Sequence, residues 1–304
     1  MQRRYTILNV FTGDREGGNP LAVVTDGEGL SIEAMQAIAL NFNLSETVFV
    51  LPPENPAHTA AIRIFTPRTE LPFAGHPTLG TSILLARNRV WRHSGAEFDA
   101  LVVLETGGGV ARVGVKPDDE GAPFGQFDAP FLPQGAGETA PEDRLAAALG
   151  LAPNEIGFEN HRPCRYSAGV PFNFVPVDGL DAIGRADIVE QYWDEAFGMD
   201  EHKAAYLYCR ETTRHKAAFH ARMFAPGMGV KEDPATGSAA IALAGVIHHF
   251  DELPEGVYEG MIEQGLEMGQ PCEVHLEFEV ENRQIRVVRI GGHAMVVREG
   301  TIEA

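Results

Sequence analysis

Two stretches of the chain, one following Gly75 and one following Gly237, have the length of a helix and are apolar on nearly every side. In the first, Leu79 and residues 83–86 cover most of the helix surface, and in the second, residues 239–247 are apolar almost throughout. A surface helix keeps a polar face, so a helix that has none must be buried on all sides. The chain therefore has to surround each of these two helices with other structure.

The two apolar stretches belong to a longer internal repeat. Residues 62–86 and 221–245 each run through an Arg-x-Phe-x-Pro strand end, a loop, a Gly-containing turn and the apolar helix. A repeat of this whole order predicts two related halves. The Pro- and Gly-rich segment 116–142 between them interrupts both helix and strand. We therefore expect an N-terminal half over residues 1–130 and a C-terminal half over 131–304, with the last strand able to pack back on the first half.

The rest of the sequence is mostly strand. Residues 272–280 alternate between apolar and polar side chains, as in a half-buried strand of an antiparallel sheet. Residues 285–290 and 294–297 continue this sheet, with a turn predicted at Gly291-Gly292. Together with the buried helices, this pattern predicts an α+β fold of two halves, each a mostly antiparallel sheet curled around one buried helix.

Composition excludes several kinds of partner. The 304 residues include 24 Lys and Arg against 43 Asp and Glu, for a formal net charge of −19. Such an acidic surface repels phosphate backbones and anionic lipid, so we expect neither nucleic acid nor a membrane as a partner. Cys164, Cys209 and Cys272 are few and odd in number, as in a reducing compartment, and the N-terminus resembles a strand more than a signal peptide. We therefore expect a cytoplasmic protein.

Both buried helices begin at a turn that can bind an anion. A helix N-terminus presents unpaired N–H groups to a carboxylate, and Gly75 and Gly237 let the backbone approach a ligand closely. The helix dipole keeps His76 neutral in the first turn, and Glu46 and Asp233 are candidate carboxylates. From these residues alone we predict an anion-binding cleft. Two ordinary helix starts, a core histidine and solvated carboxylates remain the alternatives.

Four blocks of sequence narrow these alternatives. They are NPLAVV at 19–24, NLSETVFV at 43–50, RIFTPRTELPFAGHPTLGT at 63–81 and RMFAPGMGVKEDPATGSAA at 222–240. In this order, over nearly the whole chain, they resemble the PhzF-like family of phenazine biosynthesis. The resemblance implies a diaminopimelate epimerase-like fold, in which two pseudo-equivalent domains each wrap a barrel-like sheet around a central helix. It also implies a homodimer that binds a small carboxylate substrate and shifts a proton and double bonds in it without a cofactor.

The resemblance also implies roles for individual residues. Glu46 of the NLSET block corresponds to the general acid/base that moves the proton. His76 of AGHP and Asp233 of EDPATGS correspond to residues that bracket the substrate and assist the transfer. The family's neighbouring serine and the turns that bind the substrate carboxylate correspond to Ser45, Gly75, Gly237 and Ser238.

The epimerase and racemase branches of this fold use two thiols at the same turns. Here those turns read Ala74-Gly75-His76 and Ala235-Thr236-Gly237, without cysteine, which disfavours two-thiol racemisation. Our leading hypothesis is a cofactor-free isomerase, and no metal-binding motif is present. The alternatives are an epimerase or racemase that uses Glu46 and Asp233 in place of thiols, and a non-catalytic protein that binds small acids.

Overall fold

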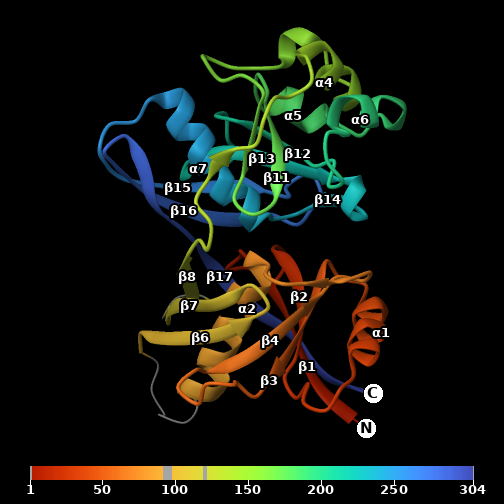
Figure 1. Cartoon of the computed structure of the whole chain (residues 1–304), viewed down its shortest axis with the longest axis vertical. Helices are drawn as coiled ribbons and strands as arrows, with labels where there is room; N and C mark the ends of the chain where they lie inside the picture. The colour runs from red at the N-terminus through yellow and green to blue at the C-terminus, as the bar shows by residue number, and fades with distance from the viewer. Residues whose placement is uncertain (1, 92–97, 119–121, 304) are drawn as a thin grey trace. The chain divides into compact units, whose positions relative to one another are not determined.

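In the computed structural model, the chain forms two compact units, each of which is described separately (Figure 1). The structure describes residues 2–91, 98–118 and 122–303. Unit 1 comprises Met1–Asp128 and Gly291–Ala304, and unit 2 comprises Ala129–Ile290. The two ends of the chain lie side by side in unit 1, because Gln2 on the first strand pairs with Glu303 on the last.

Unit 1 contains a closed barrel of eight strands. They pair in the order β1-β2-β3-β4-β6-β7-β8-β17, and β17 also pairs with β1, which closes the ring. The β2–β3 and β4–β6 pairs are parallel. The strands of this unit are β1 (Gln2–Val10), β2 (Asn19–Val24), β3 (Glu46–Leu51), β4 (Ala60–Phe65), β5 (Glu70–Leu71), β6 (Ala100–Thr106), β7 (Gly109–Lys116), β8 (Phe124–Asp128) and the end of β17 (Gln284–Glu303).

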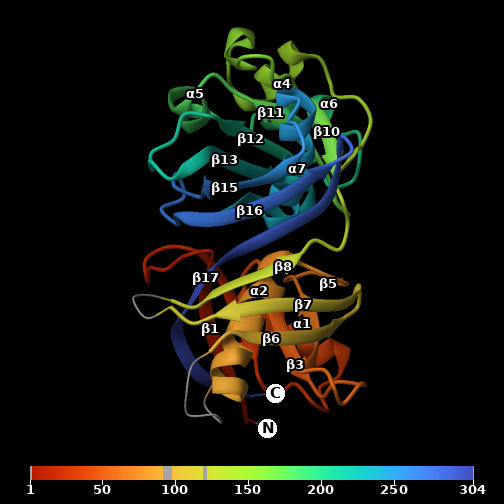
Figure 2. The ribbon, with the colours of Figure 1, turned by 90° about the vertical axis from the view of Figure 1, so that its left-hand side faces the viewer.

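Helix α2 (Gly75–Leu85) lies inside this barrel. Figure 2 shows it behind β6, β7 and β8, and every side chain from His76 to Leu85 is buried. The packing is close enough to require glycine at position 80, because a Cβ there would lie 2.6 Å from Cγ2 of Val10. The prediction of a helix buried on all sides is confirmed here.

Unit 2 repeats this plan around α7 (Gly237–Asp251), whose residues 239–247 are buried. Its strands pair in the order β9-β10-β11-β12-β13-β15-β16, and the β11–β12 and β13–β15 pairs are parallel, as β2–β3 and β4–β6 are in unit 1. The strands are β9 (Gln134–Gly135), β10 (Cys164–Ser167), β11 (Pro171–Pro176), β12 (Ala205–Cys209), β13 (Ala217–Ala225), β14 (Val230–Asp233), β15 (Gly256–Gln264) and β16 (Cys272–Glu281), which continues into β17.

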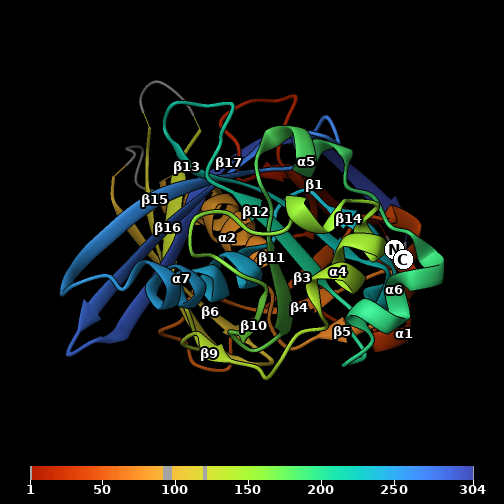
Figure 3. The same ribbon diagram turned by 90° about the horizontal axis from the view of Figure 1, so that it is seen from above.

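Further helices cover the other face of each sheet. In unit 2, α4 (Glu142–Leu149), α5 (Leu180–Arg185) and α6 (Glu190–Phe197) lie on the side of β11 and β12 opposite α7 (Figure 3). They share one apolar cluster with these strands, in which Trp193 packs with Phe224. In unit 1, α1 (Ile32–Phe42) packs in the same way against the barrel's outer face. The predicted α+β class, with two halves that each wrap a sheet around a buried helix, is confirmed.

The predicted turn at Gly291-Gly292 is wrong. Strand β17 runs unbroken from Gln284 to Glu303 and belongs to both units. Gly291 is needed for packing instead, because a Cβ there would lie 2.6 Å from the ring of Phe124. Phe124 itself belongs to β8, so the Pro- and Gly-rich segment 116–142 contains a barrel strand as well as the boundary between the units.

The described part of the chain contains no helix that is both long and apolar enough to cross a membrane. The three cysteines are free thiols, and none of them lies at the start of α2 or α7. Burial raises the pKa of Cys164 and of Cys209 to about 12, so both are protonated at neutral pH. These two thiols are therefore poorly suited to proton transfer from carbon.

Candidate active site

The predicted site residues of unit 1 lie around the start of β3. Helix α1 ends at Asn43, which adopts a left-handed conformation and redirects the chain, so that β3 begins three residues later at Glu46. Glu46 pairs in parallel register with Leu21 on β2, which brings the sequence blocks at 19–24 and 43–50 side by side. The Glu46 side chain is 17% exposed, and its neighbour Ser45 is half-buried.

His76 lies beside this carboxylate. It is the second residue of α2, and its Nδ1 is 3.3 Å from Oε2 of Glu46. The two residues are 30 positions apart in the sequence, and they meet because α2 runs through the barrel that β3 helps to form. The structure thus brings together two of the three residues that were predicted to be catalytic.

The imidazole of His76 is neutral. Burial lowers its pKa to about 3, although the backbone of Pro20 partly offsets this by accepting a hydrogen bond. Its Nε2 is buried without a hydrogen-bond partner among the residues the structure describes, which assigns the Pro20 contact and the proton to Nδ1. Nε2 therefore carries a lone pair that can accept a hydrogen bond from a ligand. The sequence predicted a neutral ring from the helix dipole, whereas burial is the larger cause.

The first turn of α2 is a candidate anion-binding element. Its N-cap is Ala74, which has no side chain able to cap the helix. Gly75 is the first helical residue and is half-buried. The backbone N–H groups of this turn are therefore suited to an incoming carboxylate.

The predicted site residues of unit 2 lie where β14 ends at Asp233 and α7 begins at Gly237. The hydroxyl of Thr236 donates a hydrogen bond to Oδ2 of Asp233 at 2.5 Å. Gly237 is buried, and Ser238, the second residue of α7, is half-buried. No side chain caps this helix start by a hydrogen bond either, so its N–H groups resemble those of α2.

Two buried residues that the sequence analysis missed hold this turn. Gln264 donates from Nε2 to the backbone oxygen of Asp233 at 2.8 Å and to Oγ1 of Thr236 at 3.2 Å. Its Oε1 accepts a hydrogen bond from the hydroxyl of Tyr206 at 3.3 Å. Gln264 and Tyr206 are both fully buried. No sequence motif marks either residue. A glutamine and a tyrosine in strands are common at the surface, and only the fold shows that these two are buried.

The two units place different residues at equivalent positions. In unit 1, Ile64 pairs with Leu71, and in unit 2, Met223, which follows the repeated arginine, pairs with Asp233. Leu71 is therefore the counterpart of Asp233. The same repeat, with gaps of equal length, aligns His76 with Ser238.

The counterpart of Glu46 is also apolar. Thr47 pairs with Phe65, and Ala205 pairs with Phe224, the repeated phenylalanine of unit 2. The residue before Ala205 is the buried Ala204, which therefore matches Glu46. Each unit thus supplies a carboxylate from a different strand, and the repeat does not build a symmetric pair of bases.

No group of three His, Cys, Asp or Glu side chains within the described ranges is arranged to hold a metal ion. Unit 1 provides a carboxylate beside a neutral imidazole, unit 2 provides a carboxylate that accepts a hydrogen bond from a hydroxyl, and each unit provides a helix start. These are the groups required for acid–base chemistry on an anionic molecule.

The fold is that of an epimerase-like α+β protein, in which each unit wraps a sheet around a buried helix. A family model described as "Phenazine biosynthesis-like protein" matches residues 8–300. The chain belongs to this family, as the sequence blocks predicted.

Relatives and solved structures agree with this assignment. An uncharacterized isomerase of Mesorhizobium japonicum is 51% identical over 99% of this chain and 98% of its own length. The trans-2,3-dihydro-3-hydroxyanthranilate isomerase of Pseudomonas aeruginosa is 34% identical over 98% of each protein. The crystal structure of a PhzF-family phenazine biosynthesis protein of Bacillus anthracis matches the whole of both chains with a TM-score of 0.88 at 26% identity. The predicted epimerase-like fold is confirmed, and the relatives' names agree with the predicted isomerase.

Proposed function

We propose that the protein is a cofactor-independent isomerase that moves a proton within a small, unsaturated carboxylic acid. The observation that carries this proposal is the contact between Glu46 and the neutral His76 at the start of a buried helix, 3.3 Å apart. A carboxylate next to an uncharged imidazole can take and return a proton without competing against a fixed positive charge.

The proposed reaction is redox-neutral. The Glu46 carboxylate takes a proton from an sp3 carbon of the substrate, and the electrons of the broken C–H bond enter the conjugated system. The double bonds shift, and the protonated Glu46 then returns its proton to a different carbon. The base ends as it began, so the atoms and electrons balance without an oxidant, a reductant or a second substrate.

The other residues support this transfer. The lone pair on Nε2 of His76 would accept a hydrogen bond from a hydroxyl or amino group of the substrate, which would satisfy an atom that is otherwise buried without a partner. The N–H groups at Gly75, and those at Gly237 and Ser238, would bind the substrate carboxylate and stabilise charge that develops during the shift. Ser45, next to Glu46, would contact the same ligand.

Asp233 is proposed as the second acid/base group. Its carboxylate accepts the hydroxyl proton of Thr236, which fixes its orientation. The Pseudomonas aeruginosa relative is named for an isomerisation of a dihydro-hydroxyanthranilate, a cyclic unsaturated acid that carries both an amino and a hydroxyl group. We propose a substrate of this class for the present chain.

The test is turnover by the purified protein with trans-2,3-dihydro-3-hydroxyanthranilate and a panel of related cyclic and open-chain unsaturated acids. We expect a change in ultraviolet absorption as the conjugated system moves, and loss of this change in Glu46→Gln. Full activity in Glu46→Gln would remove Glu46 from its central role.

The two alternatives give different products. An epimerase or racemase would invert a stereocentre and leave the double bonds in place, which chiral chromatography detects. The unequal positions of Glu46 and Asp233 in the repeat support the isomerase over this alternative. A non-catalytic protein would bind an acid saturably and leave it unchanged.

We further propose a cytoplasmic homodimer. Size-exclusion chromatography with light scattering measures the mass directly, and twice the chain mass of 33.0 kDa is expected. A single species at the mass of one chain at micromolar concentration would contradict the dimer. Recovery of the protein from the soluble cytoplasmic fraction of the source cells would support the location.

A further inference from the structure

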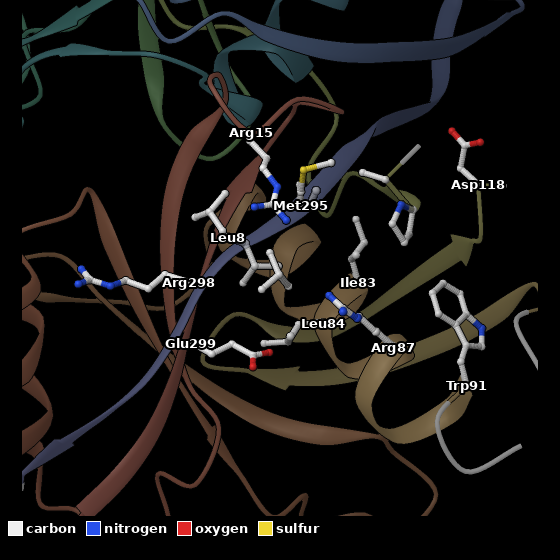
Figure 4. A pocket seen from close by; sticks show the side chains of 15 residues that line it. Leu8, Arg15, Ile83, Leu84, Arg87, Trp91, Asp118, Met295, Arg298 and Glu299 are labelled. Carbon is white, nitrogen blue, oxygen red and sulfur yellow. The ribbon is translucent and has the colours of Figure 1, made fainter. Parts of the chain in front are cut away.

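A pocket lies in unit 1, at the opposite end of α2 from His76. It has a volume of about 560 Å³, and its floor includes the buried side chains of Leu8, Ile83 and Leu84 (Figure 4). Leu84 lies eight positions after His76, which corresponds to about 12 Å along a helix. The pocket is therefore distinct from the group formed by Glu46 and His76 at the start of the helix.

Two irregular backbone segments border this pocket. One is the π-helical segment η1 (Ala86–Trp91), which directly follows α2 and contributes Arg87 and Trp91 to the lining. The other is a bulge in β17, where Arg298 pairs with Ile7 but Val296 pairs with Leu8, so that Val297 has no partner residue in the β1 ladder. Both kinds of irregularity occur preferentially at functional sites, and here both line one cavity.

The charged groups at the pocket favour a single negative charge. Figure 4 shows the guanidinium groups of Arg15 and Arg87 extending toward the middle of the pocket, whereas Arg298 points away from it. Over residues 2–91, 98–118 and 122–303, neither Arg15 nor Arg87 pairs with a carboxylate. Two acidic residues, Glu299 and Asp118, also line the pocket. These two acids oppose a dianion and leave room for a monoanion.

We propose that this pocket binds a small organic monoanion with an apolar body, such as an aryl or alkyl carboxylate or sulfonate. Its acidic group would lie between Arg15 and Arg87, since guanidinium groups pair well with carboxylates. Its apolar part would cover Leu8, Ile83 and the half-exposed side chain of Met295. In a chain with a net charge of −19, two arginines that line one pocket with an apolar floor favour an anion at this place.

The experiment uses 8-anilinonaphthalene-1-sulfonate, a fluorescent monoanion with apolar rings, titrated against the full-length protein. Arg15→Gln and Arg87→Gln each remove one charge from the pocket, and Met295→Trp fills it without changing the charge. Arg112→Gln, which removes an exposed arginine from β7, is the matched control. Circular dichroism on each variant checks the fold.

We expect one saturable site per chain. Each pocket variant should weaken binding about tenfold or more, as for a lost charge-assisted hydrogen bond, and Arg112→Gln should stay within about twofold. Octanoate should displace the probe, whereas octanamide and inorganic phosphate should not.

Unchanged binding in the three folded pocket variants would overturn the proposal. Equal displacement by octanamide would show that the charge is not recognised, and equal displacement by phosphate would show that the apolar floor is not used. Either result contradicts it. A second copy of the chain seated on the pocket would appear as self-association that Met295→Trp abolishes, and would also overturn it.

Discussion

Leu71 and Asp233 occupy equivalent positions in the two units of this protein. In unit 1, Leu71 pairs with Ile64 in a short antiparallel ladder, and in unit 2, Asp233 pairs with Met223 in the same way. Ile64 and Met223 each lie between the arginine and the phenylalanine of the repeated Arg-x-Phe sequence. A carboxylate at one of these positions and an isobutyl group at the other means that the units have diverged in chemistry while keeping one backbone plan.

The divergence predicts that, of these two residues, only Asp233 matters for turnover. In Asp233→Asn the amide oxygen can still accept the hydroxyl proton of Thr236, so the turn should keep its shape while the acid/base group is lost. We expect kcat to fall about 10²- to 10⁴-fold with little change in thermal stability. Steady-state kinetics measures this, with Leu71→Asn as the control at the equivalent position, and a kcat within twofold of wild type for Asp233→Asn would contradict the prediction.

Gln264 is expected to act by positioning Asp233. Gln264→Leu removes the hydrogen bonds to the Asp233 backbone and to Thr236, and it leaves the Tyr206 hydroxyl buried without this acceptor. We expect a loss of about 1–3 kcal/mol in unfolding free energy for an unsatisfied buried group, together with a lower kcat.

Tyr206→Phe is the companion variant. It removes only the outer hydrogen bond of this chain and leaves both contacts from Gln264 to the turn. Its kcat should remain close to wild type, at an expected stability loss of about 1 kcal/mol. Equal kcat in the two variants would show that Gln264 does not position the turn.

The repeat places an Arg–Glu ion pair at equivalent positions of the two units, which allows the effect of burial on such a pair to be compared. Arg222 donates two hydrogen bonds to Glu232, at 2.8 and 3.0 Å, and Arg63 makes the same pair of bonds to Glu70. The side chains of the unit 2 pair are 7% and 14% exposed, against 26% and 37% in unit 1. The unit 2 pair is thus the more buried one, and Arg222 also donates hydrogen bonds to the backbone oxygens of Ile183 and Ala186.

We expect Glu232→Gln to reduce the free energy of unfolding by about 3–5 kcal/mol, because it leaves a buried guanidinium with a weaker partner. Glu70→Gln should reduce it by about 1 kcal/mol or less, as for an exposed pair. Urea denaturation of both variants measures the two values. Equal losses in the two units would contradict the prediction.

Stability should also depend on pH through His220, which lies between two carboxylates. Its Nδ1 and Nε2 contact Glu263 and Glu267 at 2.8 and 2.9 Å. Burial alone would lower the pKa of His220, but the hydrogen bonds to Glu267 and Glu263 outweigh it, so the pKa is raised. The folded state therefore holds a proton that the unfolded chain releases above its ordinary pKa of about 6.5.

It follows that the stabilisation by His220 is full below about pH 6.5 and is lost as pH rises through the raised pKa of the folded state. The difference in unfolding free energy between wild type and His220→Gln should be larger at pH 6 than at pH 9. His161 provides a comparison of opposite sign, because burial lowers its pKa despite its contact with Asp251. Its variant His161→Gln should show a difference that grows from pH 5 to pH 7.

The repeat could be recognised in the sequence. The burial of both central helices could be predicted as well, because a helix with no polar face must be buried on all sides. Glu46 and His76 were singled out through the resemblance to a family, whereas the contact between them was not predicted. The turn predicted at Gly291-Gly292 was wrong, because glycine marks both turns and sites of close packing, and only the Phe124 ring beside Gly291 distinguishes them.

The support around Asp233 could not be predicted. Gln264 reaches the turn only because β15 runs beside β13 in parallel register, with Ala221 opposite Gln264. Pairing between β13 and β15, which are far apart along the chain, depends on the whole sheet, so no local sequence pattern predicts it. The pairing that makes Leu71 the counterpart of Asp233 is likewise a property of the folded ladders.

The most direct test of the central claim is the incorporation of deuterium from D2O, followed by NMR, with trans-2,3-dihydro-3-hydroxyanthranilate and the panel of unsaturated acids. Wild-type protein should place deuterium at the carbon that receives the proton, and the double bonds should move in the same molecules. Glu46→Gln, which keeps the size of the side chain, should give no label while melting at the same temperature. Label incorporated at the wild-type rate by Glu46→Gln, or exchange at a stereocentre without any shift of the double bonds, would contradict the account.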